Sequence, residues 1–336
     1  MKKLLVPVHV REQLQSEEQA GRIARSTSSI FTIWTEKGLI QAEVSGKLRH
    51  QGDAWPVVGD WVVYKSSSSD KAVIQRVLAR TTVFSRKEPG GQHNEQVMAA
   101  NMDTVLIVTS ITTEFNLQRL ERYVYQVYES GAAPAIVCTK SDLSEDAAEF
   151  KLSIERRIPA VPVYTISSVA LEGIEEFHKE LKSGHTYLLT GSSGVGKSTL
   201  INRLLGEEVL STNQVRAKDD KGRHTTTHRE MFTLDNGAVI IDTPGLRELQ
   251  LWGGSDSVEA VFSDIEALSH SCKFRNCQHK KEPGCAILQA VHNGELSEER
   301  VKNYHKLERE LHRLELKDKY GTHRANRILH GPRSSK

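Results

Sequence analysis

Residues 191–199 read GSSGVGKST, and the first eight fit the phosphate-loop pattern G-x-x-x-x-G-K-[ST]. The stretch follows an apolar run, TYLLT, and precedes the helix-like TLINRLLG. In that setting glycines let backbone N–H groups converge on phosphate oxygens at a helix amino terminus. Lys197 would contact the terminal phosphates and Ser198 would ligate Mg²⁺. A chance match is the alternative, and the strand–loop–helix order argues against it. The loop residues expected to contact nucleotide are Gly191, Ser192, Ser193, Gly194, Val195, Gly196, Lys197, Ser198 and Thr199.

A second motif, TKSD, could read the base. The Asp142 carboxylate can accept from both N1–H and the exocyclic amine of guanine, whereas adenine offers no such pair of donors. Lys140 would lay its stem along the base. Thr139 stands where GTPases usually have Asn, and we expect this departure to weaken the tether of the loop. The predicted base-reading residues are Thr139, Lys140, Ser141 and Asp142.

Ser167 and Ser168 end the next apolar run and resemble the backup loop whose backbone touches the guanine carbonyl. Serine is common in any loop, so this pair is weak evidence by itself. For TKSD, the alternative is a strand-to-helix turn in which the aspartate caps the helix.

Two later stretches complete a hydrolytic site. IIDTPG places Asp242 at the end of an apolar strand, where it can hold the outer shell of Mg²⁺, and Gly245 can donate to the γ-phosphate. Leu246 stands where a Ras-like protein has a water-orienting Gln, so unstimulated hydrolysis should be slow.

GRHTTT at residues 222–227 supplies the other catalytic candidates. His224 would orient the attacking water, and Thr225 or Thr226 would close over Mg²⁺. The alternative is that His224 only contacts RNA or solvent.

Three of the four cysteines surround a histidine in the pattern C-x4-C-x-H-x5-C: Cys272, Cys277, His279 and Cys285. Three thiolates and an imidazole suit tetrahedral Zn²⁺, and a set with no open position indicates one structural ion. The spacing fits a metal site in a reducing cytosol better than a disulfide framework. A cluster without metal is the alternative. Basic residues in the same stretch would suit RNA phosphates: Lys273, Arg275, Lys280 and Lys281.

The secondary-structure elements that position these residues are predicted from changes in the pattern of apolar and polar residues along the chain. Residues 1–27 look like a polar extension, and residues 28–95 hold short β-rich runs that favour a small barrel over a sandwich. Residues 96–252 alternate apolar runs with helix-like segments such as Asn116–Ser130, the pattern of a mainly parallel α/β sheet with ligands beyond the carboxyl ends of its strands. Residues 253–336 hold the cysteines, a charged helix with an apolar stripe and a basic tail.

The composition excludes some classes of protein. With 38% hydrophobic and 26% charged residues, the chain is not disordered throughout. No apolar run approaches the roughly 20 residues that cross a bilayer, and the amino terminus has no secretory pattern. We therefore expect a cytoplasmic protein, a monomer without a membrane partner. A net charge of +2 does not by itself indicate nucleic acid.

The base-reading motif precedes the phosphate loop, the reverse of the order in ordinary GTPases. This order, between a barrel and a Cys/His knuckle, resembles the ribosome small subunit-dependent GTPase A family of circularly permuted GTPases. The resemblance covers about residues 28–320 and rests on TKSD, GSSGVGKST, GRHTTT and CKFRNCQHKKEPGC.

The resemblance implies a multidomain fold: an all-β OB-fold barrel that binds RNA, a permuted α/β P-loop GTPase domain and a mainly α zinc domain. It also implies hydrolysis of GTP, stimulated by the small ribosomal subunit, in late maturation of that subunit, with its rRNA and guanine nucleotides as partners. Two other readings remain: an RNA-binding assembly scaffold in which GTP and GDP only switch the conformation, and an ATP-dependent enzyme, against which Asp142 argues.

Overall fold

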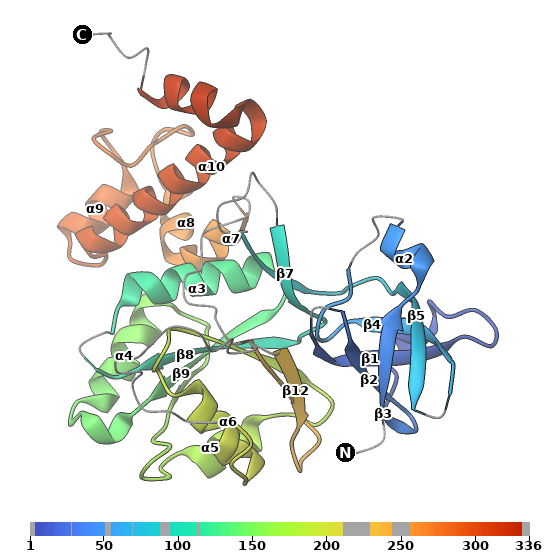
Figure 1. The fold of residues 1–336 in the computed structure, drawn as a ribbon. Coiled ribbons are helices and arrows are strands. Elements are labelled where there is room, and N and C mark those ends of the chain that lie inside the picture. Colours follow the sequence, from blue (N-terminus) through green and yellow to red (C-terminus); the bar gives the residue numbers. More distant parts are fainter. Residues whose placement is uncertain are drawn as a thin grey trace, which may run out of the picture. The chain divides into compact units, whose positions relative to one another are not determined.

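The computed structural model describes residues 4–27, 29–50, 55–68, 70–87, 95–112, 115–210, 229–243 and 256–330. The chain divides into two compact units (Figure 1). The larger contains Met1–Arg86, Glu95–Asn116 and Ser130–Leu249, and the smaller contains Lys87–Asn94, Leu117–Glu129 and Gln250–Lys336. In the described part of the chain, no helix is both long and apolar enough to cross a membrane.

A five-stranded barrel opens the larger unit. Its strands lie in the order β1-β2-β3-β5-β4, and β4 pairs back onto β1 to close the barrel. Strands β3 and β5 are parallel and the other pairs are antiparallel. The strands are β1 (Gln19–Ser26), β2 (Phe31–Thr35), β3 (Gly38–Val44), β4 (Trp61–Ser66) and β5 (Lys71–Val77), accompanied by helices α1 (Val8–Arg11) and α2 (Gly46–His50).

The barrel prediction is confirmed, but its first strand was missed. Strand β1 lies within residues 1–27, which the sequence indicated as an extension. Its burial does not alternate, because Arg22 is buried among small and apolar neighbours. The strand contains a buried cation and small residues instead of alternating apolar side chains, so the usual sequence pattern of a strand is missing. The domain limits drawn at residues 95 and 252 stay predictions.

Buried polar residues join the barrel to the sheet that follows it. The Arg22 guanidinium donates to the carbonyl oxygens of Gly59 at 3.2 Å and Asn101 at 2.7 Å. Gly59 has φ +92°, and a Cβ there would lie 2.0 Å from the Ala100 carbonyl oxygen. Asp60 is fully buried and pairs with Arg80 at 2.7 Å. The barrel therefore meets residues 100–101 through a close approach that only glycine permits and through a buried arginine whose acceptors are backbone carbonyl oxygens.

The second part of the larger unit is an α/β sheet. Its strands lie in the order β10-β9-β8-β11-β13-β12, and all neighbours are parallel except β12, which is antiparallel to β13. The strands are β8 (Thr104–Ser110), β9 (Ala133–Thr139), β10 (Val163–Thr165), β11 (Thr186–Thr190), β12 (Arg229–Thr233) and β13 (Val239–Asp242). The helices are η1 (Ser141–Leu143), α4 (Ala147–Arg157), α5 (Ile174–Glu180) and α6 (Lys197–Leu205), and a separate pair of strands is formed by β6 (Val83–Lys87) and β7 (Glu95–Ala100).

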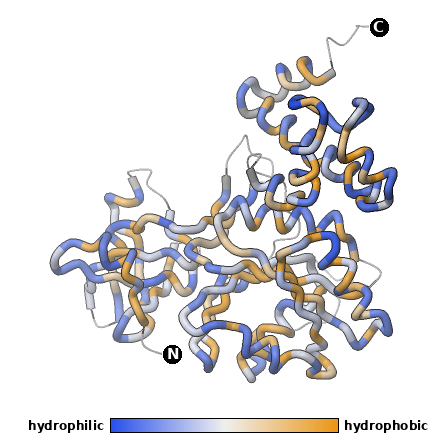
Figure 2. The backbone as a smooth tube through the Cα atoms, turned by 180° about the vertical axis from the view of Figure 1, so that it is seen from behind, coloured by the Kyte–Doolittle hydropathy of each residue, from blue (hydrophilic) through white to orange (hydrophobic). Residues whose placement is uncertain are grey.

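Continuous apolar runs form the parallel strands because both faces of the sheet are covered. All five residues of β11 are buried, and so are the central residues of β8 and β9. Figure 2 shows hydrophobic stretches alternating with hydrophilic ones along the backbone. The core beneath the nucleotide loops includes Leu106, Val137, Leu189, Leu200 and Ile240. These side chains hold the strand ends, and thus the loops, in fixed places.

The smaller unit is helical. It consists of α3 (Leu117–Glu129), α7 (Asp256–Val261), α8 (Ser263–Ser269), α9 (Ala286–His292) and α10 (Glu298–His330), in which Gly321 interrupts the helical backbone. Helix α3 confirms the helix predicted over residues 116–130, yet it packs against α7 and belongs to this unit rather than to its sequence neighbours.

One buried arginine of α10 links this helix to α3, α7 and α8. Arg300 is 3% exposed and bonds to Glu121 of α3, to Asp264 of α8 at 2.8 Å and to the Val261 carbonyl oxygen at 2.8 Å. Its guanidinium also lies 4.2 Å from the centre of the Phe262 ring. Removing this side chain would take a cation away from the buried Glu121 carboxylate, which is costly, and from Asp264, whose side chain is 32% exposed.

Candidate nucleotide site and metal centre

The predicted nucleotide residues meet at one edge of the α/β sheet. Parallel strands β9, β10, β11 and β13 all end there, and β8 lies between β9 and β11. The base-reading motif follows β9, the serine pair follows β10, the phosphate loop follows β11, and Asp242 ends β13. Strands distant in the chain thus bring their loops to a common edge, the usual position of ligands in such sheets.

The phosphate loop has the backbone that its glycines predict. Gly191 has φ +139°, and a Cβ there would lie 2.1 Å from the Val108 carbonyl oxygen, so no side chain fits. Helix α6 begins at Lys197, directly after the loop. The Lys197 ammonium donates to the carbonyl oxygens of Gly191 at 2.7 Å and Ser192 at 2.8 Å. The backbone carbonyl oxygens of the loop therefore hold the Lys197 ammonium over the loop.

The charges of Asp242 and Lys197 each shift the pKa of the other group. Strand β13 pairs with β11 so that Asp242 lies beside Leu189, just before the loop. Burial raises the pKa of Asp242, and the Lys197 charge opposes that shift. Burial likewise lowers the pKa of Lys197, and Asp242 opposes it. Ser198, in the first turn of α6, is half-buried. A hydroxyl and a carboxylate at this edge are suitable oxygen ligands for Mg²⁺ or its waters.

Thr139 ties the base-reading loop to the phosphate loop. Its hydroxyl lies 2.5 Å from the Val195 carbonyl oxygen and 3.1 Å from that of Thr109, and the residue is 2% exposed. The methyl group and hydroxyl also lie within 4.0 Å of where a Cβ on Gly196 would stand. The tether that we expected to be weakened is thus present, made by threonine instead of asparagine.

Asp142 lies in the exposed turn of η1, after Lys140, which has a left-handed backbone with φ +60°. The Ser167 hydroxyl donates to Asp142 Oδ1, and the same oxygen of Ser167 accepts from the Ala170 N–H at 2.9 Å. Ser167 is fully buried and Ser168 is 8% exposed. Ser167 therefore lies next to the carboxylate that the sequence predicts to read the base, and its hydroxyl bonds to that carboxylate.

Five residues on which sequence predictions rest fall outside the described residues. These are the catalytic candidates His224, Thr225 and Thr226, the predicted γ-phosphate donor Gly245, and Leu246.

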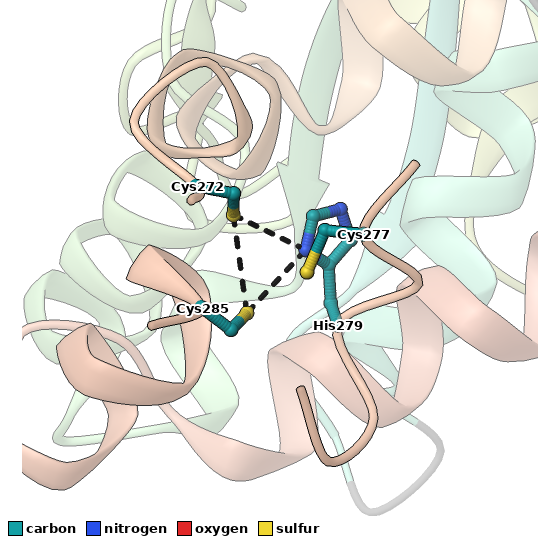
Figure 3. A group of neighbouring side chains, drawn as sticks. All are labelled: Cys272, Cys277, His279 and Cys285. Atoms are coloured by element: carbon teal, nitrogen blue, oxygen red, sulfur yellow. Dashed lines mark hydrogen bonds between the residues drawn. The ribbon is translucent and has the colours of Figure 1, made fainter. Parts of the chain in front are cut away.

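The four predicted metal ligands converge (Figure 3). Their ligand atoms all lie within 4.8 Å of one another. His279 Nδ1 is 3.6 Å from the Cys272 sulfur and 3.5 Å from the Cys285 sulfur, and those two sulfurs are 3.9 Å apart. Tetrahedral zinc, with bonds of about 2.3 Å to sulfur and about 2.0 Å to nitrogen, requires separations of roughly 3.5 to 3.8 Å. The cluster is consistent with one zinc ion. Cys138, by contrast, is buried in β9.

Comparisons with known proteins agree with this geometry. A model of the RsgA GTPase domain matches residues 77–252, and one of the RsgA N-terminal domain matches residues 20–74. A model described as 50S ribosome-binding GTPase matches residues 186–319. A protein of Methanosarcina acetivorans named small ribosomal subunit biogenesis GTPase RsgA is 45% identical, over 87% of this chain and 79% of that protein. This chain belongs to the RsgA GTPase family.

Other relatives extend the match. A protein of Lactiplantibacillus plantarum named small ribosomal subunit biogenesis GTPase RsgA 2 is 42% identical, over 87% of this chain and 83% of its own length. The crystal structure of YjeQ from Thermotoga maritima has a TM-score of 0.65 and 28% identity, covering 88% of this chain and 98% of YjeQ. YloQ, described as a circularly permuted GTPase, has a TM-score of 0.64 and 26% identity, covering 88% of this chain and 96% of YloQ.

Membership in the RsgA GTPase family makes the chain a GTP hydrolase, with GTP as its substrate and Mg²⁺ as the metal that such enzymes use in general. The sequence prediction of a barrel, a permuted P-loop GTPase and a carboxy-terminal Cys/His domain is confirmed.

One residue that shapes the Cys/His cluster was missed in the sequence. The Glu282 carboxylate accepts from the backbone N–H groups of Gln278 at 3.2 Å, Lys280 at 2.8 Å and Lys281 at 2.9 Å. These donors, led by Lys281 and Lys280, lower the pKa of Glu282 to about 2. Glu282 thereby folds the turn between His279 and Cys285. The only sequence signal for this role was the position of Glu282 between His279 and Cys285, and an acidic residue there could equally have been a solvated surface residue.

A first prediction tests the Thr139 tether. Replacing Thr139 by Val should weaken GDP binding about tenfold, because the loop loses the hydrogen bond of the Thr139 hydroxyl and leaves a buried carbonyl oxygen without that donor, at about 1–3 kcal/mol. Dissociation of a fluorescent GDP analogue measures the effect. The matched control is Thr165→Val, since the buried Thr165 hydroxyl has no partner among the described residues. GDP release equally fast in Thr139→Val and wild type would contradict the role.

Proposed function

We propose that this GTPase acts in late maturation of the small ribosomal subunit, hydrolysing GTP to GDP and phosphate in a reaction that the subunit stimulates. The observation that carries the proposal is the RsgA family match, since the relatives are named small ribosomal subunit biogenesis GTPases. The partners would be the subunit, its rRNA and guanine nucleotides. The protein would act in the cytoplasm as a monomer.

In the proposed site, the nine residues from Gly191 to Thr199 bind the phosphates, with Lys197 as the cation that meets the terminal ones. The Ser198 hydroxyl and the Asp242 carboxylate would hold Mg²⁺. Asp142 reads the guanine edge, Lys140 covers the base, and Thr139 and Ser141 hold that loop in place. Ser167 orients Asp142, and Ser168 offers backbone to the guanine carbonyl. His224, Thr225, Thr226 and Gly245 would complete the site around the γ-phosphate.

Turnover with purified small subunits tests the proposal. We expect GTP hydrolysis to be slow without subunits, because Leu246 cannot position water, and to rise severalfold or more when subunits are added. A GTPase rate that small subunits leave unchanged would favour the scaffold alternative, in which nucleotide only switches the conformation. Competition between GTP and ATP separates the proposal from an ATP-dependent enzyme.

The His224 role has its own test. Replacing His224 by Ala should lower subunit-stimulated turnover by about 10²-fold, the usual contribution of a positioned acid or base. GTP affinity should stay within a factor of two, because a water-orienting group does not hold the ground-state nucleotide. His292, in the last turn of α9, gives a matched control when changed to Ala. Undiminished stimulated turnover in His224→Ala would remove this residue from the mechanism.

One zinc ion would stabilise the knuckle without taking part in hydrolysis. Its proposed ligands are Cys272, Cys277, His279 and Cys285, a closed set with no open position for substrate. Replacing Cys285 by Ser should reduce bound zinc from one per chain to almost none, measured by metal analysis after dialysis. Cys138→Ala is the control and should retain the ion. A full zinc content in Cys285→Ser would exclude Cys285 as a ligand.

The knuckle also offers a basic surface for rRNA. Lys273, Arg275, Lys280 and Lys281 are all exposed there, beside the exposed ring of Phe274. Such a surface binds phosphates with an affinity that falls as salt rises. In the barrel, Trp34 and Trp61 are buried and Trp55 is half-exposed, so fewer aromatic faces are available for stacking than the sequence offers.

A further inference from the structure

Arg203 connects the two ends of the nucleotide site. It lies on α6, the helix that begins at Lys197, and its Nε donates to the Ser168 carbonyl oxygen at 3.0 Å. Ser168 follows Ser167, whose hydroxyl donates to the Asp142 carboxylate. One side chain of the phosphate-binding helix therefore holds the loop that orients the base-reading aspartate. Neither the phosphate-loop pattern nor the base-reading motif includes Arg203.

An acidic residue lies on the far side of Arg203. Its Nη1 lies 3.9 Å from Glu208 Oε1, and Glu208 Oε2 accepts from Asn202 Nδ2 at 2.8 Å. Asn202 is 2% exposed, and its amide also bonds to the backbone of Leu210 in both directions, at 2.7 and 2.8 Å. Both amide hydrogens and the amide oxygen of Asn202 are thus engaged. Glu208, although 65% exposed, accepts from this buried amide, and the bond favours a position of its charge beside Arg203.

The serine loop depends on few contacts of its own. Ser167 N–H donates to the Glu172 carbonyl oxygen at 2.9 Å, and Leu171 has a left-handed backbone with φ +61°. The buried Ser168 hydroxyl has no partner among the described residues. Because a peptide group is planar, holding the Ser168 carbonyl also sets the direction of the Val169 N–H. Arg203 thereby sets the direction of the Val169 N–H. It also holds the loop that contains Ser167, whose hydroxyl bonds to Asp142.

We propose that Arg203 is a positioning residue for guanine selectivity, which acts by holding the Ser167–Val169 loop against the phosphate-binding helix. The proposal rests on the proposed function, because it takes the bound base to be guanine. Arg203 need not touch the nucleotide. Its loss should weaken recognition of the base and leave recognition of the phosphates unaltered.

The test uses the full-length Arg203→Met protein, which keeps the aliphatic stem and loses the guanidinium. Three probes separate the effects: GDP, IDP (which lacks the exocyclic amine read by Asp142) and pyrophosphate (which has no base). We expect GDP affinity to fall about tenfold, as for loss of one hydrogen bond to a charged group. The preference for GDP over IDP should fall with it, while pyrophosphate affinity stays within a factor of two.

Two further variants sharpen the result. Arg203→Lys retains a cationic donor and should recover most of the selectivity. Arg156→Met makes the same change at an exposed arginine of α4 and should behave as wild type.

Wild-type selectivity in Arg203→Met, or equal losses of GDP and pyrophosphate affinity, would overturn the proposal. Equal losses would mean that Arg203 supports only the phosphate loop. If the wild-type protein itself binds GDP and IDP equally, the guanine assignment in the proposed function fails first, whatever Arg203 does.

Discussion

Replacing Asp142 by Asn should convert a guanine site into a xanthine site. Ser167 donates to Asp142 Oδ1, so the oxygen of the asparagine amide takes that position and its NH₂ group faces the base. Guanine presents two donors to this edge and would meet another donor. Xanthine presents an oxygen where guanine has its amine, and that oxygen accepts from the amide.

Losing two hydrogen bonds to a carboxylate should lower GDP affinity by roughly 10²- to 10⁴-fold. XDP affinity should rise until it exceeds that of GDP, and titration calorimetry with the two nucleotides measures both changes. The matched control is Asp146→Asn, because Asp146 is exposed and makes no side-chain cap at the start of α4. A GDP preference that survives in Asp142→Asn would show that this carboxylate does not read the base.

Replacing Lys197 by Ala should nearly abolish binding of the triphosphate. The ammonium is held by the carbonyl oxygens of Gly191 and Ser192, where it can exchange those bonds for phosphate oxygens without moving far. Its charge is also the one that opposes the raised pKa of buried Asp242. Loss of Lys197 therefore removes attraction for phosphate and leaves the carboxylate less compensated.

Two charge-assisted bonds to the β- and γ-phosphates correspond to roughly 10²- to 10⁴-fold in GTP affinity. Equilibrium binding of a non-hydrolysable GTP analogue measures the loss. Lys179→Ala provides the control, since Lys179 is an exposed lysine that pairs with Glu175 across one turn of α5. Normal analogue binding by the Lys197→Ala protein would place the triphosphate elsewhere.

Much of the site could be predicted because its motifs are contiguous. The phosphate loop, the base-reading motif and the metal ligands each lie within a short stretch, so their spacing is visible in the chain. Alternating apolar and helical runs also indicated the parallel sheet, and this placed the motifs at strand ends. The chemistry of a loop between a strand and a helix depends on local residues, which a sequence displays directly.

The sequence did not predict the contacts between distant segments, because only the order of the strands in the sheet brings those segments together. Thr139 meets Val195, 56 residues away, and Arg203 meets Ser168, 35 residues away. Arg300 meets Glu121 across 179 residues, which accounts for a helix of the central segment belonging to the carboxy-terminal unit. Strand β1 was missed for a related reason, since Arg22 is buried only because two distant carbonyl oxygens receive it.

The sequence alone determined which chemical groups are present and in what local order: a phosphate loop, a base-reading carboxylate ahead of it, and three thiols with an imidazole. Only the tertiary structure decided how these groups are braced, through Thr139, Ser167 and Arg203. The physical reason is that local backbone form follows from adjacent residues, whereas a hydrogen bond between two loops exists only after the sheet has set their distance and direction.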